Sequence, residues 1–264
     1  MQAQAIIKYI YQWMKNYAKT AKSKGFVIGV SGGVDSAVTS TLAAETGLSV
    51  LCVEMPIHQV ADQVNRAQEH IAWLKKNYSN VSSADVKLTN VFDLFIDAVP
   101  AVEDSENRLR SLVNTRARLR MTTLYYFAQL YNYLVTGTGN KVEDFGIGFY
   151  TKYGDGGVDL APIADLMKTE VFALGKTLGV CQSILDAPPT DGLWNDDRSD
   201  EEQIGASYPE LEWAMTFEGD ENKLSNRQKE VLTIYRSFHQ ANQHKMIPIP
   251  VCNIPINLKN SIEF

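Results

Sequence analysis

The stretch "GFVIGVSGGVDSAV", residues 25–38, joins an apolar, β-prone run to a glycine pair and then to a helical pattern. Gly32 and Gly33 permit a tight turn and close approach of the backbone, and the first amides of a helix have no intrahelical partner. Such a turn offers N–H groups and the positive end of a helix dipole to an anion. The stretch therefore predicts a strand, a phosphate-binding loop and a helix. A plain turn in which Ser31 or Asp35 caps the helix is the alternative.

Short apolar runs alternate with longer helical patterns along the rest of the chain. Strands are predicted at 26–30, 48–55, near 85–91 and at 133–137, and helices at roughly 35–46, 59–77, 105–132 and 165–180. Strands separated by helices indicate a parallel sheet covered on both faces. Right-handed crossovers place the loops that leave such strands at one edge of the sheet. The segments "SGGVDS", "MPIHQ" and "TGTGNKVE" should therefore meet at one site.

Composition restricts the class of protein. The 264 residues are 45% apolar and 21% charged, which is ordinary for a globular protein with a substantial core. The net charge of −6 counts against a nucleic-acid partner, because such proteins rely on basic residues. No apolar run is long enough to span a membrane. We therefore expect no nucleic-acid or membrane partner.

The start of the chain and its cysteines indicate a cytoplasmic protein. Residues 1–20 carry apolar side chains at helical spacing and lack the features of a signal peptide. Cys52, Cys181 and Cys252 are odd in number and far apart, so neither a disulfide framework nor a zinc site is indicated. We expect an amphipathic N-terminal helix and a reducing environment.

Two carboxylates follow predicted strands at the edge where the loops should meet. Asp35 lies in the glycine loop, and an acidic residue beside phosphates is repulsive unless a cation lies between them. Glu143 lies a few residues beyond the break at Gly137 and Gly139. Mg²⁺ usually takes one or two carboxylates together with phosphate oxygens and water. The pair predicts a Mg²⁺ site, although Glu143 taken alone could be a solvated surface residue.

Several motifs resemble known families. "SGGVDS" (31–36) resembles the loop of the N-type ATP pyrophosphatases, which grips pyrophosphate and lacks the lysine of a P-loop. The chain further resembles the ammonia-dependent NAD synthetases over nearly its whole length and in the expected order. That resemblance is carried by "NTRARLRM" (114–121), "GTGN" (137–140), "TKYGDGGVD" (151–159), "APIADLMKTEV" (161–171), "PPTDGLW" (188–194), "DEEQIGASYPELE" (200–212) and "HKMIPIP" (244–250).

The resemblance implies a fold and an assembly. The expected fold is a Rossmann-like three-layer α/β sandwich with a mostly parallel central sheet, like that of the adenine nucleotide alpha hydrolases. We expect a single domain over 1–264, with an N-terminal helix at 1–24, a pyrophosphatase core at about 25–190 and a C-terminal segment at about 191–264. The resemblance also implies a homodimer with the deamido-NAD site at the subunit interface.

The resemblance also implies a reaction. The nicotinate carboxylate of deamido-NAD would attack the α-phosphorus of ATP and expel pyrophosphate, and ammonia would then displace AMP to give NAD. ATP is the expected co-substrate and Mg²⁺ the expected metal. The first strand lies only about 25 residues from the start, which leaves no room for an amidase domain. Free ammonia is therefore the expected nitrogen donor.

Site residues are carried over where the motifs match. Those expected to contact ATP are Gly29, Val30, Ser31, Gly32, Gly33, Val34, Asp35, Ser36, Thr138, Lys168 and Thr190. Those expected to hold deamido-NAD are Arg118, Lys152, Asp159, His244 and Lys245. Mg²⁺ is assigned to Asp35 and Glu143, and a catalytic role to Lys168. Asp155 is the hypothesis for the group that binds and deprotonates ammonium, because it lies between Lys152 and Asp159.

Other interpretations remain open at this point. Arg110, Arg116, Arg118 and Arg120 form a run that could be a solvated or ion-paired face, and His244 and Lys245 could be ordinary tail residues. Another ATP pyrophosphatase, such as the synthetase half of GMP synthetase or a tRNA-modifying enzyme, would share "SGGVDS" but lack the later motifs. A regulatory module would bind ATP without releasing pyrophosphate.

Two further segments affect the comparison with the ammonia-dependent NAD synthetases. The spacing between Glu143 and Lys152 is about one residue longer than in some relatives, because of "FGIGFYTK". The acidic "WNDDRSDEE" (194–202) resembles the segment that orders over the substrates in this family.

Overall fold

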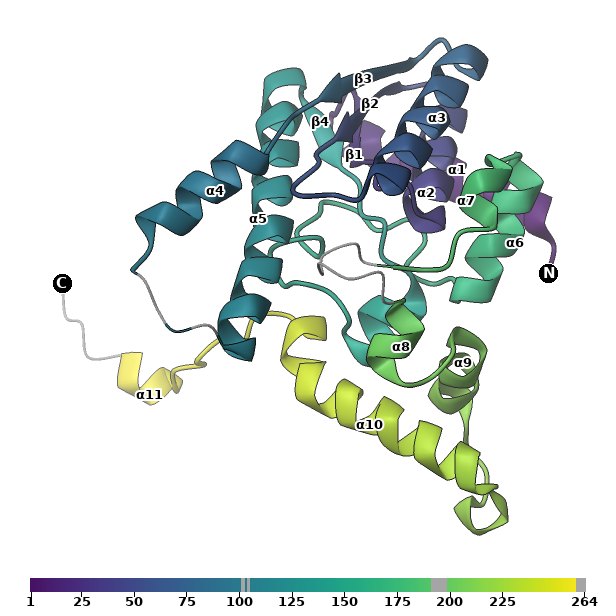
Figure 1. Cartoon of the computed structure of the whole chain (residues 1–264), viewed down its shortest axis with the longest axis vertical. Helices are drawn as coiled ribbons and strands as arrows, with labels where there is room; N and C mark the ends of the chain where they lie inside the picture. The colour runs from purple at the N-terminus through teal and green to yellow at the C-terminus, as the bar shows by residue number, and fades with distance from the viewer. Residues whose placement is uncertain (101–102, 104, 191–198, 260–264) are drawn as a thin grey trace.

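The computed structural model describes residues 1–100, 103, 105–190 and 199–259 (Figure 1). Its parallel sheet has the strand order β3-β2-β1-β4. The strands are β1 (Gly25–Gly29), β2 (Ser49–Glu54), β3 (Val81–Asp85) and β4 (Tyr133–Val135). In this register Phe26 lies opposite both Val50 and Leu134. Because β1 is flanked by β2 and β4, the loop after it emerges between the loops that leave those two strands.

The helices surround this sheet and extend beyond it. They are α1 (Ala3–Thr20), α2 (Val34–Glu45), α3 (Ala61–Asn77), α4 (Thr89–Ala98), α5 (Glu106–Tyr131), α6 (Lys168–Leu178), α7 (Gln182–Leu185), α8 (Asp200–Ile204), α9 (Tyr208–Thr216), α10 (Asn226–Met246) and α11 (Ile256–Lys259). A π-helical turn spans Val142–Ile147, and a 3₁₀ turn spans Glu221–Lys223. None of the helices in the described residues is long and apolar enough to cross a bilayer.

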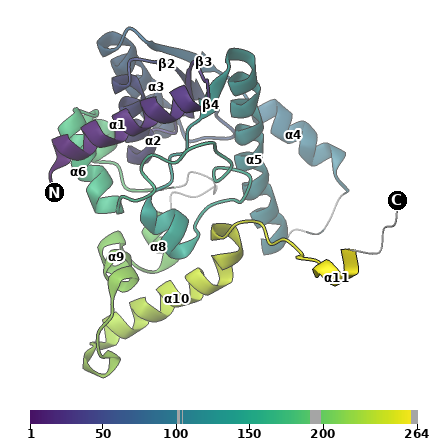
Figure 2. The same ribbon diagram turned by 180° about the vertical axis from the view of Figure 1, so that it is seen from behind.

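The alternating side chains of β1 divide the core into two layers. Phe26 and Ile28 pack on one face with residues of α1, α2, α3 and α6, and Figure 2 shows α1 lying across that side of the molecule. Val27 packs on the other face with residues of α4 and α5. Burying each large side chain of this kind contributes roughly 1.5–3 kcal/mol. The predicted three-layer α/β arrangement with a parallel sheet is confirmed.

A third apolar cluster lies beyond the carboxyl edge of the sheet. Val142 and Ile147 of the π-helical turn pack against Leu211 of α9 and Val231 of α10. In Figure 1, α9 and α10 lie below the sheet, and the C-terminal end of α10 approaches the lower end of α5. This cluster fixes the turn that carries Glu143.

The element boundaries correct two predictions. The strand predicted near 85–91 is wrong: β3 ends at Asp85, and α4 begins at Thr89. β3 is an edge strand with polar, partly exposed side chains, whereas the apolar residues that follow have helical spacing. The helix predicted at 165–180 begins at Lys168, because the Glu170 side chain accepts a hydrogen bond from the Met167 amide and so caps the first turn.

Candidate active site

A cleft of about 770 Å³ opens at the carboxyl edge of the sheet. Its walls contain the glycine loop after β1, the start of the segment after β2, and the loop after β4. One face of α5, the first turns of α3 and α6, and the end of α10 also contribute to the wall. The three loops that the sequence expects at one edge therefore do meet there.

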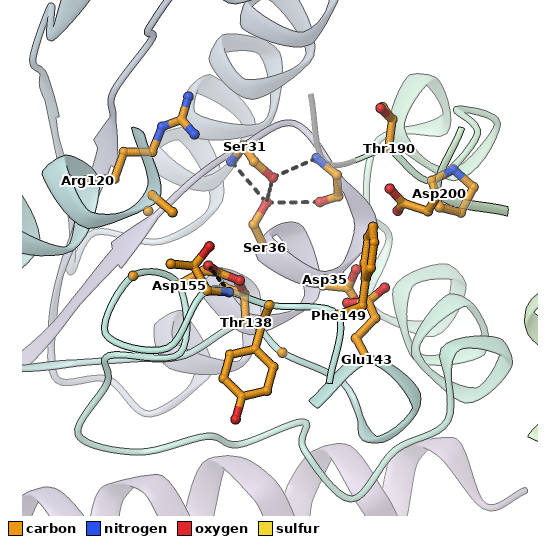
Figure 3. A pocket seen from close by; sticks show the side chains of 18 of the residues that line it. Ser31, Asp35, Ser36, Arg120, Thr138, Glu143, Phe149, Asp155, Thr190 and Asp200 are labelled. Atoms are coloured by element: carbon orange, nitrogen blue, oxygen red, sulfur yellow. Dashed lines mark hydrogen bonds between the residues drawn. The ribbon is translucent and has the colours of Figure 1, made fainter. Parts of the chain in front are cut away.

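The glycine loop is built for close approach of the backbone. Gly32 has φ +81°, and a Cβ at this position would lie 2.5 Å from the carbonyl oxygen of Gln63. The Ser31 and Ser36 hydroxyls lie 3.1 Å apart, and Ser36 Oγ also donates to the Gly33 carbonyl at 3.0 Å (Figure 3). Gly33 is the N-cap of α2 and gives it no side-chain cap, and the Ser31 hydroxyl accepts a hydrogen bond from the Gly33 amide at 3.3 Å. The amino end of α2 therefore faces the cleft.

A buried ion triad lies at the mouth of this loop. The Lys168 ammonium is 2.6 Å from Asp35 Oδ2 and 2.8 Å from Glu143 Oε1, and the lysine is 4% exposed. Each member comes from a different element: the first turn of α2, the π-helical turn and the start of α6. Asn140 joins two of these elements, since it donates to Asp35 Oδ1 at 3.1 Å and accepts from the Glu143 amide at 3.1 Å.

Burial and the opposite charges of neighbouring side chains shift the pKa values of the triad in opposite directions. Burial alone would lower the pKa of Lys168, but Asp35 and Glu143 raise it above its ordinary value, so the side chain stays a cation. Burial raises the pKa of Asp35 despite the attraction of Lys168. Burial also acts to raise the pKa of Glu143, but Lys168, Tyr208 and Asn140 outweigh it and hold that pKa below its usual range. Glu143 is thus the more firmly ionised carboxylate.

Tyr208 and Asp200 extend the triad, and the sequence assigned neither of them a role. The Tyr208 hydroxyl lies 2.5 Å from Glu143 Oε1 and 3.2 Å from Asp200 Oδ2, and its ring lies 4.8 Å from the Lys168 ammonium. Burial, with Glu143 and Asp200 nearby, raises the pKa of the phenol, which therefore keeps its proton. Both residues lie in "DEEQIGASYPELE", so that motif is the sequence feature that could have pointed to them.

The donor set fits Mg²⁺ held together with a nucleotide. Two carboxylate groups that converge on one ammonium group are close enough to bind one metal ion between them instead. Within the described residues, no group of three or more histidine, cysteine or acidic side chains could hold a metal by itself. The remaining ligands would be phosphate oxygens and water, as is usual for Mg²⁺.

Asp155 and Asp144 add two more acidic side chains to the cleft wall. Asp155 Oδ1 accepts a hydrogen bond from the Thr151 amide at 3.0 Å, which holds the carboxylate in the glycine-rich loop while leaving it open to the cleft. Loss of solvation within the cleft raises the pKa of Asp144 well above its ordinary value and also raises the pKa of Asp155, although that carboxylate stays open to the cleft. Asp144, which the sequence did not single out, lies where a side chain on Gly139 would collide with it.

Three further predicted residues line the cleft: Thr138, Thr190 and Lys245. Figure 3 shows Thr138 near Asp155 and Thr190 on the other side of the glycine loop. The Lys245 ammonium donates to the carbonyl oxygens of Gly148 and Tyr150, each at 2.9 Å. Burial lowers its pKa, and Asp155 partly offsets that effect.

Four residues expected to hold deamido-NAD lie outside the wall of this cleft as the described residues form it. Arg118 donates to the carbonyl oxygen of Lys152 at 3.3 Å, and the Lys152 ammonium donates to the carbonyl oxygen of His244 at 2.7 Å. The structure thus brings these three together at the end of α10. Asp159 lies apart from them, with its carboxylate accepting hydrogen bonds from the Tyr125 hydroxyl and the Val135 amide.

The arginines of α5 point in different directions. Arg110 and Arg120 line the cleft, whereas the Arg116 guanidinium lies 5.0 Å from the ring of Phe92 in the core. Arg120 donates to the Met55 carbonyl at 3.0 Å. The residues of this helix that line the cleft lie on one face, with neighbours three or four positions apart: Glu106, Arg110, Val113, Asn114, Ala117, Arg120, Met121 and Leu124. This spacing is the sequence feature that could have identified one face of α5 as a wall of the cleft.

Only part of the acidic segment "WNDDRSDEE" (194–202) belongs to the residues that the structure describes. Residues 194–198 lie outside the described residues, as do 191–193 of "PPTDGLW". Ser199 to Glu202 form the cap and first turn of α8, where the Ser199 hydroxyl accepts from the Glu202 amide at 3.2 Å.

Comparisons with known proteins agree on one family. The family model described as NAD synthase matches residues 6–248. An NH(3)-dependent NAD(+) synthetase of Mesoplasma florum is 35% identical over 246 residues, covering 93% of this chain and 95% of that protein. The NMN synthetase from Francisella tularensis has a similar structure, with a TM-score of 0.85, 30% identity, and coverage of 96% of this chain and 100% of that one. The NH3-dependent NAD synthetase from Campylobacter jejuni subsp. jejuni gives a TM-score of 0.76 and 27% identity, with coverage of 96% and 100%.

Proposed function

Because the chain belongs to the NAD synthase family, we propose that it amidates the nicotinate carboxylate of deamido-NAD, using ATP and ammonia, to give NAD. The observation that carries this proposal is the ion triad of Asp35, Glu143 and Lys168 at the mouth of the glycine loop. A carboxylate pair beside a phosphate-binding loop suits a metal–nucleotide complex. A buried lysine beside that pair supplies a cation for the phosphates.

The groups in the cleft support the proposed binding of ATP. The amino end of α2 and the hydroxyls of Ser31 and Ser36 would bind the pyrophosphate portion, and Lys168 would move from the carboxylates to the phosphates. Asp35 and Glu143 would hold Mg²⁺, which when bound offsets the charge on the departing pyrophosphate. Without cations, the carboxylates of the cleft would repel both ATP and the acid substrate.

The chemistry needs two displacements. In the first, a nicotinate carboxylate oxygen bonds to the α-phosphorus as the bond from that phosphorus to the pyrophosphate oxygen breaks. In the second, ammonia bonds to the acyl carbon, and AMP leaves with the electrons of the acyl–oxygen bond. The attacking nitrogen must lose protons, and we assign Asp155 to accept one of them, because its raised pKa suits a general base.

The role of Asp155 can be tested by substitution. Asp155→Asn should raise the KM for ammonium and lower kcat by about 10²-fold, as expected for loss of a general base. Pyrophosphate release should persist, because the first displacement does not use this group. Asp165→Asn is the matched control, since its side chain is 96% exposed. An unchanged ammonium requirement in Asp155→Asn would exclude the assignment.

A second candidate substrate is nicotinate mononucleotide. It is favoured by the likeness to an NMN synthetase structure and by the position of Arg118, Lys152, Asp159 and His244 outside the cleft wall. The two acids share the nicotinate group and differ in the AMP half. Comparing kcat/KM for the two acids at saturating ATP separates the candidates, and a preference for the mononucleotide would replace deamido-NAD in the proposal.

Homodimerisation is part of the proposal and is supported by exposed apolar side chains. α5 exposes Tyr126, Leu130 and Tyr131, and α4 exposes Leu94 and Phe95. A stable dimer buries about 800 Å² per partner, and exposed aromatic and aliphatic residues are typical of such faces. Sedimentation equilibrium should give twice the mass of the chain for the wild type and the monomer mass for a Tyr126→Asp, Leu130→Asp variant.

The central experiment follows the three products of the proposed reaction. The protein is incubated with ATP, Mg²⁺ and deamido-NAD, with either ammonium or glutamine, while pyrophosphate, AMP and NAD are measured. We expect equal amounts of AMP and NAD with ammonium, and Asp35→Ala should lose both. Pyrophosphate release by Asp35→Ala at saturating Mg²⁺ would contradict the metal assignment. ATP binding without turnover would favour a regulatory module.

A further inference from the structure

The hydroxyl of Tyr208 contacts the charged triad, although its ring belongs to an apolar cluster. Tyr208 is 3% exposed and packs with Val142, Ile204 and Leu211. A phenylalanine would satisfy that packing. The hydroxyl, however, lies 2.5 Å from Glu143 Oε1, the same oxygen that accepts from Lys168 at 2.8 Å. Figure 3 shows Asp200, the other hydrogen-bond partner of this hydroxyl, on the same side of the cleft as Glu143.

We propose that Tyr208 is a positioning residue for the Glu143 carboxylate, with Asp200 holding the phenol in place. This inference rests on the proposed role of Glu143 as a Mg²⁺ ligand. Two donors, Tyr208 and Lys168, converge on Oε1 and fix the carboxylate in one orientation. That orientation leaves Oε2 for the metal. When Lys168 turns to the phosphates, the Tyr208 hydroxyl still donates to Glu143 and, together with Asn140, keeps the carboxylate in place.

The backbone of Tyr208 is itself held firmly. The Tyr208 amide donates to Glu201 Oε1 at 2.8 Å, which ties α9 to α8. Ser207 and Glu210 form a capping box at the same point, with the Ser207 amide donating to Glu210 Oε2 at 2.9 Å. A donor on such a fixed support can orient a metal ligand, as outer hydrogen bonds commonly do.

Tyr208→Phe isolates the hydroxyl, because it keeps the ring in the cluster and over the Lys168 ammonium. Mn²⁺ serves as the probe, titrated by electron paramagnetic resonance in the presence of α,β-methylene-ATP, which cannot release pyrophosphate. We expect Tyr208→Phe to raise the Kd for Mn²⁺ about tenfold, the effect of losing one hydrogen bond to a charged group. Tyr235→Phe is the matched control, since Tyr235 packs against the same cluster without hydrogen-bonding to Glu143, and should stay within twofold of the wild type.

A double-mutant cycle separates positioning from packing. In a Glu143→Gln background, Tyr208→Phe should change the Mn²⁺ Kd by less than twofold, because the carboxylate it positions is gone. A Tyr208→Phe variant that folds normally and binds Mn²⁺ like the wild type overturns the inference. An additional tenfold loss in the Glu143→Gln background also overturns it. Wild-type protein that binds no Mn²⁺ with the nucleotide would instead refute the proposed metal site.

Discussion

Lys168 and His70 show how burial can leave one side chain charged and another neutral. Lys168 is 4% exposed but lies between two carboxylates, so its pKa rises. His70 is fully buried between α2 and α3, stacks on Trp73 and contacts the Ser40 hydroxyl at 3.0 Å. Burial lowers the pKa of His70 to about 4, and neither the Ala37 carbonyl nor the nearby Glu69 restores it.

The neutral His70 makes stability depend on pH. Its pKa is depressed in the folded state, so the unfolded chain takes up a proton first and stability falls as the pH drops from about 6.5 to about 4. Between pH 7 and pH 4.5 this effect should cost about 2–3 kcal/mol of unfolding free energy. Urea unfolding at both pH values should show the loss in the wild type and a smaller loss in His70→Gln. His58→Gln, at an exposed pair with Asp93, should behave like the wild type. Parallel losses in all three proteins would rule out this explanation.

At the scale of the element, the strand–loop–helix unit from β1 to α2 has the strictest geometry. Gly32 has a positive φ and lies against the Gln63 carbonyl, so a Cβ would meet both backbone strain and a collision. Gly47, after α2, also has a positive φ, +72°, but beyond its chain neighbours no atom of the described residues lies within 4 Å of the point that a Cβ would occupy. Comparing the two positions therefore separates the cost of backbone strain, which both would have with a Cβ, from the cost of a steric collision, which only Gly32 would have.

This contrast predicts different effects of alanine at the two positions. Gly47→Ala should destabilise by about 1 kcal/mol, the cost of a left-handed conformation for a residue with a Cβ. Gly32→Ala should cost at least about 2 kcal/mol, since a displaced loop is added to the strain, and should lose ATP binding. Urea unfolding and isothermal titration with ATP measure the two effects. Equal stability losses with ATP binding intact in both would contradict the role given to the collision.

The accuracy with which the sequence predicts a strand depends on how deeply that strand is buried. β1 and β2 are continuous apolar runs because both faces of the sheet are covered, and their positions follow from the sequence. β3 escaped detection because an edge strand needs no such run. The sequence predicts about one additional residue between Glu143 and Lys152 relative to some relatives. The π-helical turn at Val142–Ile147 overlaps that segment, and an i→i+5 turn accommodates one more residue than an α-helical turn.

At the scale of the whole molecule, the sequence predicts the loops of the site better than its walls. Loops after parallel strands converge by topology alone, so the glycine loop and Glu143 could be placed in advance. Tyr208 and Asp200 come from α9 and α8, whose docking depends on the cluster formed with α10. The contacts of the Tyr208 hydroxyl with Glu143 and with Asp200 form only in the folded protein, so no local sequence pattern encodes them. The positions of Arg118 and Asp159 outside the cleft likewise follow from packing.

The ion triad means that the protein contains its own counter-ion for the two carboxylates that we propose as metal ligands. Lys168 neutralises much of the charge of Asp35 and Glu143 before any ligand arrives, so folding should not depend on the magnesium supply. We expect the melting temperature to shift by less than about 1 °C when EDTA is added, and to rise with Mg²⁺ and ATP together through binding to the folded state. A fall of several degrees in EDTA alone would show that the metal is structural. A newly made chain could thus reach its final fold first and acquire nucleotide and metal afterwards, as substrates rather than as parts of its architecture.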